Sequence, residues 1–63
     1  MSEFLWLKII RTEKGLTQKQ VAEMIGTTRE NYNAYENGRV KPMDVAKYKI
    51  AKALDFDIKK WGE

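Results

Sequence analysis

The sequence predicts an all-α fold, and three observations support this class. Apolar residues recur at spacings of three and four residues, as they do on one face of a helix. No segment alternates apolar and polar residues for long enough to indicate a strand. Four glycines and one proline divide the chain into short segments. A length of 63 residues allows one domain, so we expect residues 1–63 to form a single unit.

The first helix is expected to run from a cap at Ser2 to about Lys14, with Gly15 ending it. Leu5 and Ile9 lie on roughly the opposite face from its main apolar stripe, and one small core cannot easily bury both faces. The main stripe follows the i+3/i+4 spacing and comprises Phe4, Leu7, Ile10, Arg11 and Lys14.

The second helix is short and has a clear start signal. Thr17 and Gln20 match a capping box, in which a threonine oxygen accepts from the third amide and the glutamine side chain reaches back. Gly26 ends this helix after about eight residues. Its inner face is predicted to consist of Val21, Ala22 and Ile25.

The third helix begins after a second pair of threonines. Either Thr27 or Thr28 can cap it, and Gly38 follows its end. Tyr32 and Tyr35 are three residues apart and supply its inward face.

A basic loop over residues 39–42 leads to a fourth helix, expected from about Met43 to Leu54. Asp57 can cap a last short turn that follows this helix. The inner seam of the fourth helix is predicted to be Met43, Ala46, Ile50 and Leu54, with Ala51 and Ala53 beside it.

Composition excludes several classes of function. The chain has no cysteine and no histidine, which removes disulfides, zinc fingers and catalysis by thiolate or imidazole. With no glycine-rich phosphate loop either, we expect no enzyme, no catalytic residue, no metal and no cofactor. The longest apolar run, residues 4–7, is far too short to span a bilayer. Without a recognisable signal peptide, a cytoplasmic protein with no membrane partner is the expectation.

Charge gives the first indication of a partner. Twelve basic and nine acidic residues leave a net charge of +3, and the pI is about 9.3. The excess lies entirely in residues 39–63, which hold seven bases and four acids. A basic domain of this size suits a polyanion, although solvated lysines on an ordinary surface give the same balance.

Residues 18–37 contain the most informative pattern. A small residue, Ala22, precedes Gly26 by four positions, and glycine can reverse the chain there with a positive φ. Apolar and aromatic residues at the flanking spacings point to a shared interior. Together these features indicate a helix-turn-helix unit, with a generic helical hairpin as the alternative.

The chain resembles the lambda-repressor-like family, the phage Cro and repressor type of helix-turn-helix regulator. The resemblance runs from about Leu7 to Trp61. It rests on motifs in register: Gly15-Leu16-Thr17-Gln18, Val21-Ala22, Ile25-Gly26-Thr27-Thr28-Arg29, Tyr35-Glu36-Asn37-Gly38-Arg39, Lys41-Pro42 and Ile50-Ala51-Lys52-Ala53-Leu54. It implies a compact five-helix domain that binds duplex DNA, with the helix at about 28–36 in the major groove.

The resemblance also implies roles for individual residues. Arg11 and Glu36 match a salt bridge that often joins the first and third helices of the family. The positions that face bases in the family are here Arg29, Glu30, Asn33 and Ala34. The positions that contact phosphates are here Gln18, Thr28, Asn37, Arg39 and Lys41.

The chemistry of these side chains agrees with the implied roles. Arginine offers a two-pronged donor to guanine, asparagine pairs with adenine, glutamate accepts from cytosine and alanine can contact a thymine methyl. Amide, hydroxyl and basic groups suit phosphates. Glu30 follows Arg29 directly, so the two could pair in the free protein.

Apolar residues near both ends of the chain leave two interpretations open. Trp6, Ile58 and Trp61 either pack on one another to complete the core or form a dimer interface. Dimers of this family bind palindromic sites, so a homodimer on DNA is expected.

The leading functional hypothesis is a sequence-specific, double-stranded-DNA-binding transcriptional regulator, of the kind that acts as a phage or mobile-element repressor. The alternative is an antitoxin or protein-binding adaptor with the same fold, whose partner is a toxin or another regulator.

Overall fold

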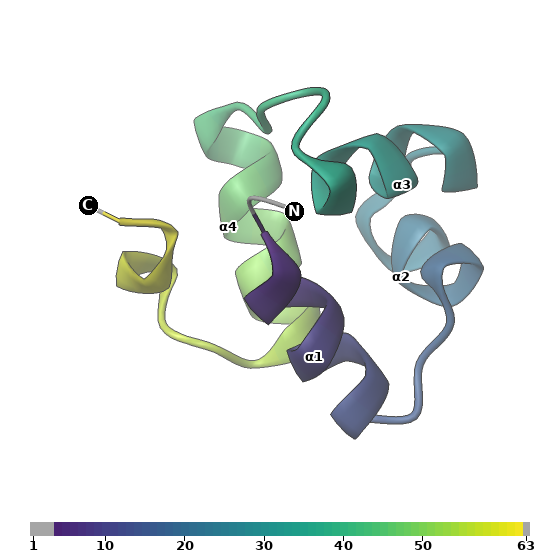
Figure 1. The fold of residues 1–63 in the computed structure, drawn as a ribbon, viewed down its shortest axis with the longest axis horizontal. Coiled ribbons are helices and arrows are strands. Elements are labelled where there is room, and N and C mark those ends of the chain that lie inside the picture. Colours follow the sequence, from purple (N-terminus) through teal and green to yellow (C-terminus); the bar gives the residue numbers. More distant parts are fainter. Residues whose placement is uncertain (1–3, 63) are drawn as a thin grey trace.

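The structure, a computed structural model, describes residues 4–62 and contains only helices and turns in that range (Figure 1). The all-α prediction is therefore confirmed for this part of the chain. The elements are α1 (Leu5–Glu13), α2 (Gln18–Ile25), α3 (Arg29–Asn37), α4 (Asp44–Leu54) and a 3₁₀ turn, η1 (Ile58–Trp61).

The expectation of five helices is wrong in its last member. The described chain has four α-helices, and η1 is a 3₁₀ helix of four residues. Its backbone bonds span three residues, as from Lys60 N to Asp57 O at 2.9 Å. The Asp57 side chain caps it by accepting from Lys59 N, and Gly62 ends it with a φ of 96°. The four residues between Asp57 and Gly62 are too few for a series of α-helical hydrogen bonds, each of which spans four residues.

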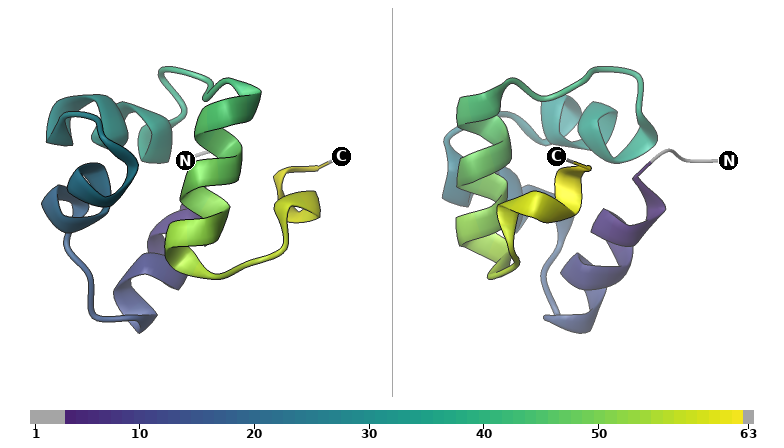
Figure 2. Two further views of the ribbon diagram at one scale, coloured as in Figure 1. Left: turned by 180° about the vertical axis from the view of Figure 1, so that it is seen from behind. Right: turned by 90° about the vertical axis from the view of Figure 1, so that its left-hand side faces the viewer.

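The helices form one small bundle around α4. The pair α2 and α3 lies on one side of α4 and η1 lies on the other (Figure 1 and the left view of Figure 2). α2 packs against both α3 and α4, while α1 packs against α3. The loop between α3 and α4 arches over one end of the bundle (Figure 1).

The core draws one or more side chains from every helix. α1 buries Leu7 and Arg11, whereas Leu5 and Ile9 on its other face are 45% and 48% exposed, so only one face is buried as expected. The predicted cap Ser2 lies outside the described residues. The core cluster consists of Leu7, Val21, Ala22, Ile25, Tyr32, Ile50, Leu54 and Trp61.

Two predicted caps fix where α2 and α3 begin. Thr17 accepts from Gln20 N at 3.0 Å, and Gln20 Oε1 accepts from Thr17 N at 2.8 Å, which confirms the capping box. At α3 the cap is Thr28, which accepts from Asn31 N at 3.1 Å. Thr27 accepts from the Asn31 side chain instead. The structure thus decides between the two threonines.

The predicted seam of α4 is wrong at Met43. This residue is the N-cap of α4, with an extended backbone at ψ 167°, and it is 80% exposed. Pro42 is buried beside it and anchors the entering chain, so the helical face begins one residue later, at Asp44. The later seam positions Ile50 and Leu54 are buried as predicted.

The two ends of the described chain meet in an aromatic cluster. Trp6 and Trp61 pack edge to face with ring centroids 5.1 Å apart, and Phe4 and Phe56 complete the group. The indole N–H of Trp61 donates to Lys47 O at 3.2 Å. Trp61 is only 8% exposed. Edge-to-face packing and this hydrogen bond place Trp61 in the core of the chain, as in the first of the two interpretations, and its part in a dimer interface stays a prediction.

Candidate nucleic-acid interface

α2 and α3 are joined by a tight turn that holds them at a fixed angle. Gly26 takes a left-handed conformation with φ 77°, and Thr27 N bonds back to Ala22 O at 2.9 Å. Glycine reaches this φ without a Cβ clash. The small Ala22 side chain is buried where α2 meets its neighbours. The turn leaves the first residues of α3, Arg29 and Glu30, exposed.

The N-termini of α2 and α3 open onto one surface. Arg29 from α3 and Gln18 from α2 line the same hollow, together with Lys19 and Thr17. The first amides of any helix have no intrahelical acceptor, and the helix dipole makes this end positive. With Arg29 and Lys19 beside them, these amides form a surface suited to phosphate groups.

A buried ion pair supports this surface from below. Arg11 Nε donates to Glu36 Oε2 at 2.6 Å and Arg11 Nη2 to Glu36 Oε1 at 3.3 Å. Arg11 Nη1 also donates to Leu16 O at 2.8 Å. Arg11 and Glu36 are 8% and 3% exposed. The pair therefore fixes α1 and the following loop against α3.

The ion pair continues into a chain of side-chain hydrogen bonds that reaches the surface. Gln18 Nε2 donates to Glu36 Oε1 at 2.9 Å, and Asn33 Nδ2 donates to Gln18 Oε1 at 3.0 Å. The Asn33 oxygen accepts from Asn37 Nδ2 at 2.9 Å and from Arg39 Nη2 at 3.3 Å. We call these residues (Arg11, Glu36, Gln18, Asn33, Asn37 and Arg39) the amide relay.

Hydrogen bonding, burial and charge shift three pKa values in this region. The hydrogen bonds to Glu36 raise the pKa of the Arg11 guanidinium. Burial alone would raise the pKa of Glu36, but hydrogen bonds from Arg11 and Gln18 outweigh it and hold the pKa below the usual range. Burial raises the pKa of Tyr32, and the nearby Glu36 carboxylate raises it further. Tyr32 is fully buried, and its hydroxyl lies close to the Glu36 carboxylate but makes no hydrogen bond of standard geometry within residues 4–62.

The predicted base-facing residues divide into two groups. Arg29 and Glu30 are exposed, and no ion pair joins them in the described part of the chain, contrary to the pairing considered from sequence. Asn33 is half-buried and engaged in the amide relay. Ala34 is 8% exposed, and its carbonyl accepts from Arg39 N at 3.0 Å. The chain after α3 thus turns back onto the end of the helix, and contact of Ala34 with a base stays a prediction.

The predicted phosphate contacts lie around the same surface. Thr28, Asn37, Arg39 and Lys41 are exposed, and Gln18 is half-buried. The amide relay brings Gln18, Asn37 and Arg39 together, although they come from α2, from α3 and from the loop after it. Thr28 caps α3 next to Arg29, and Lys41 lies two residues beyond Arg39.

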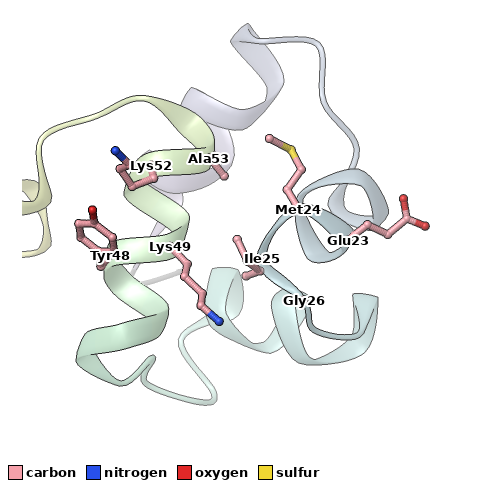
Figure 3. Close-up of a pocket in the computed structure, with 8 residues that line it drawn as sticks. All are labelled: Glu23, Met24, Ile25, Gly26, Tyr48, Lys49, Lys52 and Ala53. Carbon is pink, nitrogen blue, oxygen red and sulfur yellow. The ribbon is translucent and has the colours of Figure 1, made fainter.

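Sequence reasoning missed a groove between α2 and α4 (Figure 3). Met24 and Tyr48 are 54% and 55% exposed there, with Ile25 between the two helices. Lys52 Nζ lies 5.8 Å from the centre of the Tyr48 ring, and Lys49 also lines the groove. The available signal was that Met24 and Tyr48 fall outside every predicted apolar face.

No helix within residues 4–62 is long and apolar enough to cross a bilayer. No group of three or more carboxylate side chains in that range could hold a metal ion.

Comparison with known proteins gives consistent matches. The helix-turn-helix family model matches residues 7–61. The chain is 44% identical over 52 residues to the uncharacterized HTH-type transcriptional regulator YqaF of Bacillus subtilis, covering 82% of this chain and 68% of that protein. It is 46% identical over 44 residues to an uncharacterized HTH-type transcriptional regulator of Methanothermobacter thermautotrophicus, covering 70% and 64%.

A third relative is shorter in its match. The chain is 44% identical over 36 residues to the SPbeta prophage-derived uncharacterized HTH-type transcriptional regulator YonR of Bacillus subtilis, covering 57% of this chain and 33% of that protein. No solved structure gives a significant match.

Proposed function

This chain belongs to the helix-turn-helix family of DNA-binding transcriptional regulators, and on that premise we propose that it binds duplex DNA sequence-specifically with α3 in the major groove. Residues 1–63 act as a single DNA-binding domain in this proposal. α2 lies across the phosphate backbone, and the loop after α3 contacts the backbone beyond it. The protein acts by occupying an operator, as a repressor of the phage or mobile-element kind.

The observation that carries the proposal is the exposure of Arg29 and Glu30 on the first turn of α3. Arg29 offers two parallel donors to guanine O6 and N7, and Glu30 offers acceptors to cytosine N4. Gln18 and Lys19 line the hollow beside Arg29, where a phosphate next to the groove would lie. The prophage-derived name of one relative supports the mobile-element part of the proposal.

Selection from a random duplex library tests this proposal. The selection is run at near-physiological salt, because phosphate-only binding weakens steeply with salt while specific binding survives better. We expect one enriched motif that contains guanine or cytosine at the positions read by Arg29 and Glu30. Folded protein that enriches no motif would rule out sequence-specific binding by this chain alone.

We also propose that two copies bind one operator. One domain of this size reads only a half-site, and dimers of such domains bind half-sites about one helical turn apart. Ile58 is 42% exposed and lies on η1, whereas Trp6 and Trp61 are occupied by the aromatic cluster. Sedimentation with and without the selected DNA tests this idea. Finding one copy per duplex at tens of micromolar protein would end it.

The groove between α2 and α4 supports a second candidate function, an antitoxin or protein-binding adaptor. Exposed Met24 and Tyr48 give it an apolar wall, with Lys49 and Lys52 near it (Figure 3). Co-expression with the product of the neighbouring gene should then yield a stoichiometric complex that Met24→Asp disrupts. Met43→Asp is the matched control, because Met43 is 80% exposed and does not line this groove. A complex that tolerates Met24→Asp would remove the support that the groove gives to this function.

A further inference from the structure

We propose that Asn33 is a positioning residue, which holds Gln18 and Arg39 in place for the phosphate backbone and does not itself read a base. The inference rests on the proposed function and changes the expected role of Asn33 from reading a base to positioning phosphate-contacting residues. Base readout by α3 then falls on Arg29 and Glu30, the two exposed side chains of its first turn.

The direction of the amide relay is set from its buried end. The Glu36 carboxylate can only accept hydrogen bonds, so Gln18 must turn its NH₂ group toward it, at 2.9 Å. The Gln18 oxygen then faces Asn33, whose NH₂ group donates to it at 3.0 Å. Each amide in turn fixes the orientation of the next.

The exposed end of the amide relay demands the same direction. The Arg39 guanidinium can only donate, so Asn33 must turn its oxygen toward it, at 3.3 Å. Asn37 donates to that oxygen as well, at 2.9 Å. Because both ends require one orientation, the two amides between them have no favourable flipped state. This agreement indicates a built network and not a chance contact between surface side chains.

The hydrogen-bonding groups of Asn33 are committed to this network. An asparagine that reads adenine presents its oxygen and its NH₂ group to the base at the same time. Here the oxygen already accepts from Asn37 and Arg39, while the NH₂ group donates to Gln18. Turning Asn33 toward a base would leave the half-buried Gln18 oxygen without its donor, which carries a free-energy cost.

Asn33 therefore couples the positions of two residues, Gln18 and Arg39, that are expected to contact phosphates. Gln18 lies at the start of α2 and Arg39 lies in the loop after α3, and Asn33 bonds to both. Gln18 is also hydrogen-bonded to the buried Glu36. The position of Arg39 therefore depends on the core through the side-chain amides of Asn33 and Gln18. Asn33 therefore acts on affinity for any DNA sequence.

The network is tested first in the free protein. In ¹⁵N-labelled samples, Asn33→Ala should shift the side-chain NH₂ signals of Gln18, and Arg39→Ala should shift those of Asn33. Asn31→Ala is the matched control, since Asn31 bonds to Thr27 and Tyr35 outside the amide relay and should leave Gln18 unmoved. Gln18 signals that stay in place in folded Asn33→Ala would overturn the proposal. This test needs no DNA and is independent of the proposed function.

The second test measures DNA binding on the selected site and on every single-base variant of it. Asn33→Ala should weaken binding to all of them by about 2- to 10-fold, the range expected for one lost hydrogen bond. The order of preference at each base pair should be unchanged. The effects of Asn33→Ala and Arg39→Ala should combine to less than their product, because one residue acts through the other.

The contrary result is equally specific. Loss of preference at a single base pair in Asn33→Ala, with an effect that multiplies fully with Arg39→Ala, would identify Asn33 as a base reader and overturn the proposal. Circular dichroism establishes that each variant is folded. A wild-type protein that selects no sequence would reject the proposed function, and the NMR result would then decide alone whether Asn33 orders Gln18.

Discussion

Arg11 and Glu36 form a buried ion pair that joins α1 to α3, with Nε and Oε2 only 2.6 Å apart. Twenty-five residues separate the two in sequence. The Glu36 carboxylate also accepts from Gln18, so the same group stabilises the fold and orients the surface proposed to bind DNA. Such a pair contributes rigidity, and removing one partner costs far more than replacing both.

Arg11→Ala should therefore leave a buried carboxylate without its main partner. We expect a loss of about 3–5 kcal/mol in the free energy of unfolding. A chain of this length has roughly 3–9 kcal/mol in total, so this loss removes a third or more of its stability. Arg11→Met combined with Glu36→Leu should be clearly more stable than Arg11→Ala. Urea unfolding followed by circular dichroism measures the free energy of unfolding of the wild type and the two variants. Equal values for all three proteins would contradict a stabilising contact between Arg11 and Glu36.

The lowered pKa of Glu36 predicts acid sensitivity. A carboxyl whose pKa is lower in the folded state than in the unfolded state contributes stability above the unfolded value, about 4.3. That contribution is lost as the pH falls below this value and through the lower folded pKa. The melting temperature of the wild type should therefore fall as the pH is lowered through this range. Glu36→Gln should start from a lower melting temperature and lose less of it on acidification. A steeper loss in Glu36→Gln would contradict the prediction.

Tyr32→Phe should be tolerated despite the full burial of this residue. The Tyr32 hydroxyl is buried close to Glu36 and makes no hydrogen bond of standard geometry in residues 4–62, so removing it relieves a desolvation cost at little loss of bonding. We expect the free energy of unfolding at pH 7 to stay level or to rise by about 1 kcal/mol. Tyr35→Phe is the control, because the Tyr35 hydroxyl accepts from Asn31 at 3.0 Å and its loss should destabilise.

The same substitution predicts a change at alkaline pH. The pKa of Tyr32 is raised in the folded state, so its contribution is intact below the unfolded value of about 10 and declines above it. Tyr32→Phe should lose less stability than the wild type between pH 9 and about pH 11. Urea unfolding across this range is the measurement, and parallel losses in the two proteins would show that Tyr32 does not titrate with unfolding.

Arg29 and Lys41 should differ in what their removal does to DNA binding. Arg29→Ala should cost about 1–3 kcal/mol on the selected site and flatten the preference at one base pair. Lys41→Ala should weaken all sequences alike and reduce the salt dependence of binding by about one ion. Titrations on cognate and single-base variant sites, at several salt concentrations, separate the two effects. An unchanged sequence preference in Arg29→Ala would rule out its role as a reader.

The features that sequence alone predicted correctly are mostly local. The capping box of Thr17 and Gln20 and the chain reversal at Gly26 depend on contacts within five residues, so residue type and spacing suffice. The register of α2 and the inward face of α3 at Tyr32 follow from helical periodicity. The choice between Thr27 and Thr28 was a matter of one residue, and only the backbone conformation at Thr28 decided it.

The features that sequence missed depend on how the elements meet. Met43 has the right spacing for the seam of α4, but the buried Pro42 makes the helix begin after it. Trp6 and Trp61 lie near opposite ends of the chain, and only the folded structure shows that their rings pack on each other. Ala34 fits a base-facing position by register, and only the folded structure shows that it is no more than 8% exposed. Periodicity reports which side of a helix is apolar and not what covers that side.

The sequence by itself determined the class of fold, the helix-turn-helix unit and the family, because these follow from caps, glycine positions and periodic side chains read along one chain. Only the tertiary structure decided that Asn33 belongs to the amide relay and that Arg29 and Glu30 remain exposed. Asn33 lies fifteen residues from Gln18 and six from Arg39. Hydrogen bonds over such separations have no local signature, since they exist only after packing has brought α2, α3 and the following loop within about 3 Å of one another.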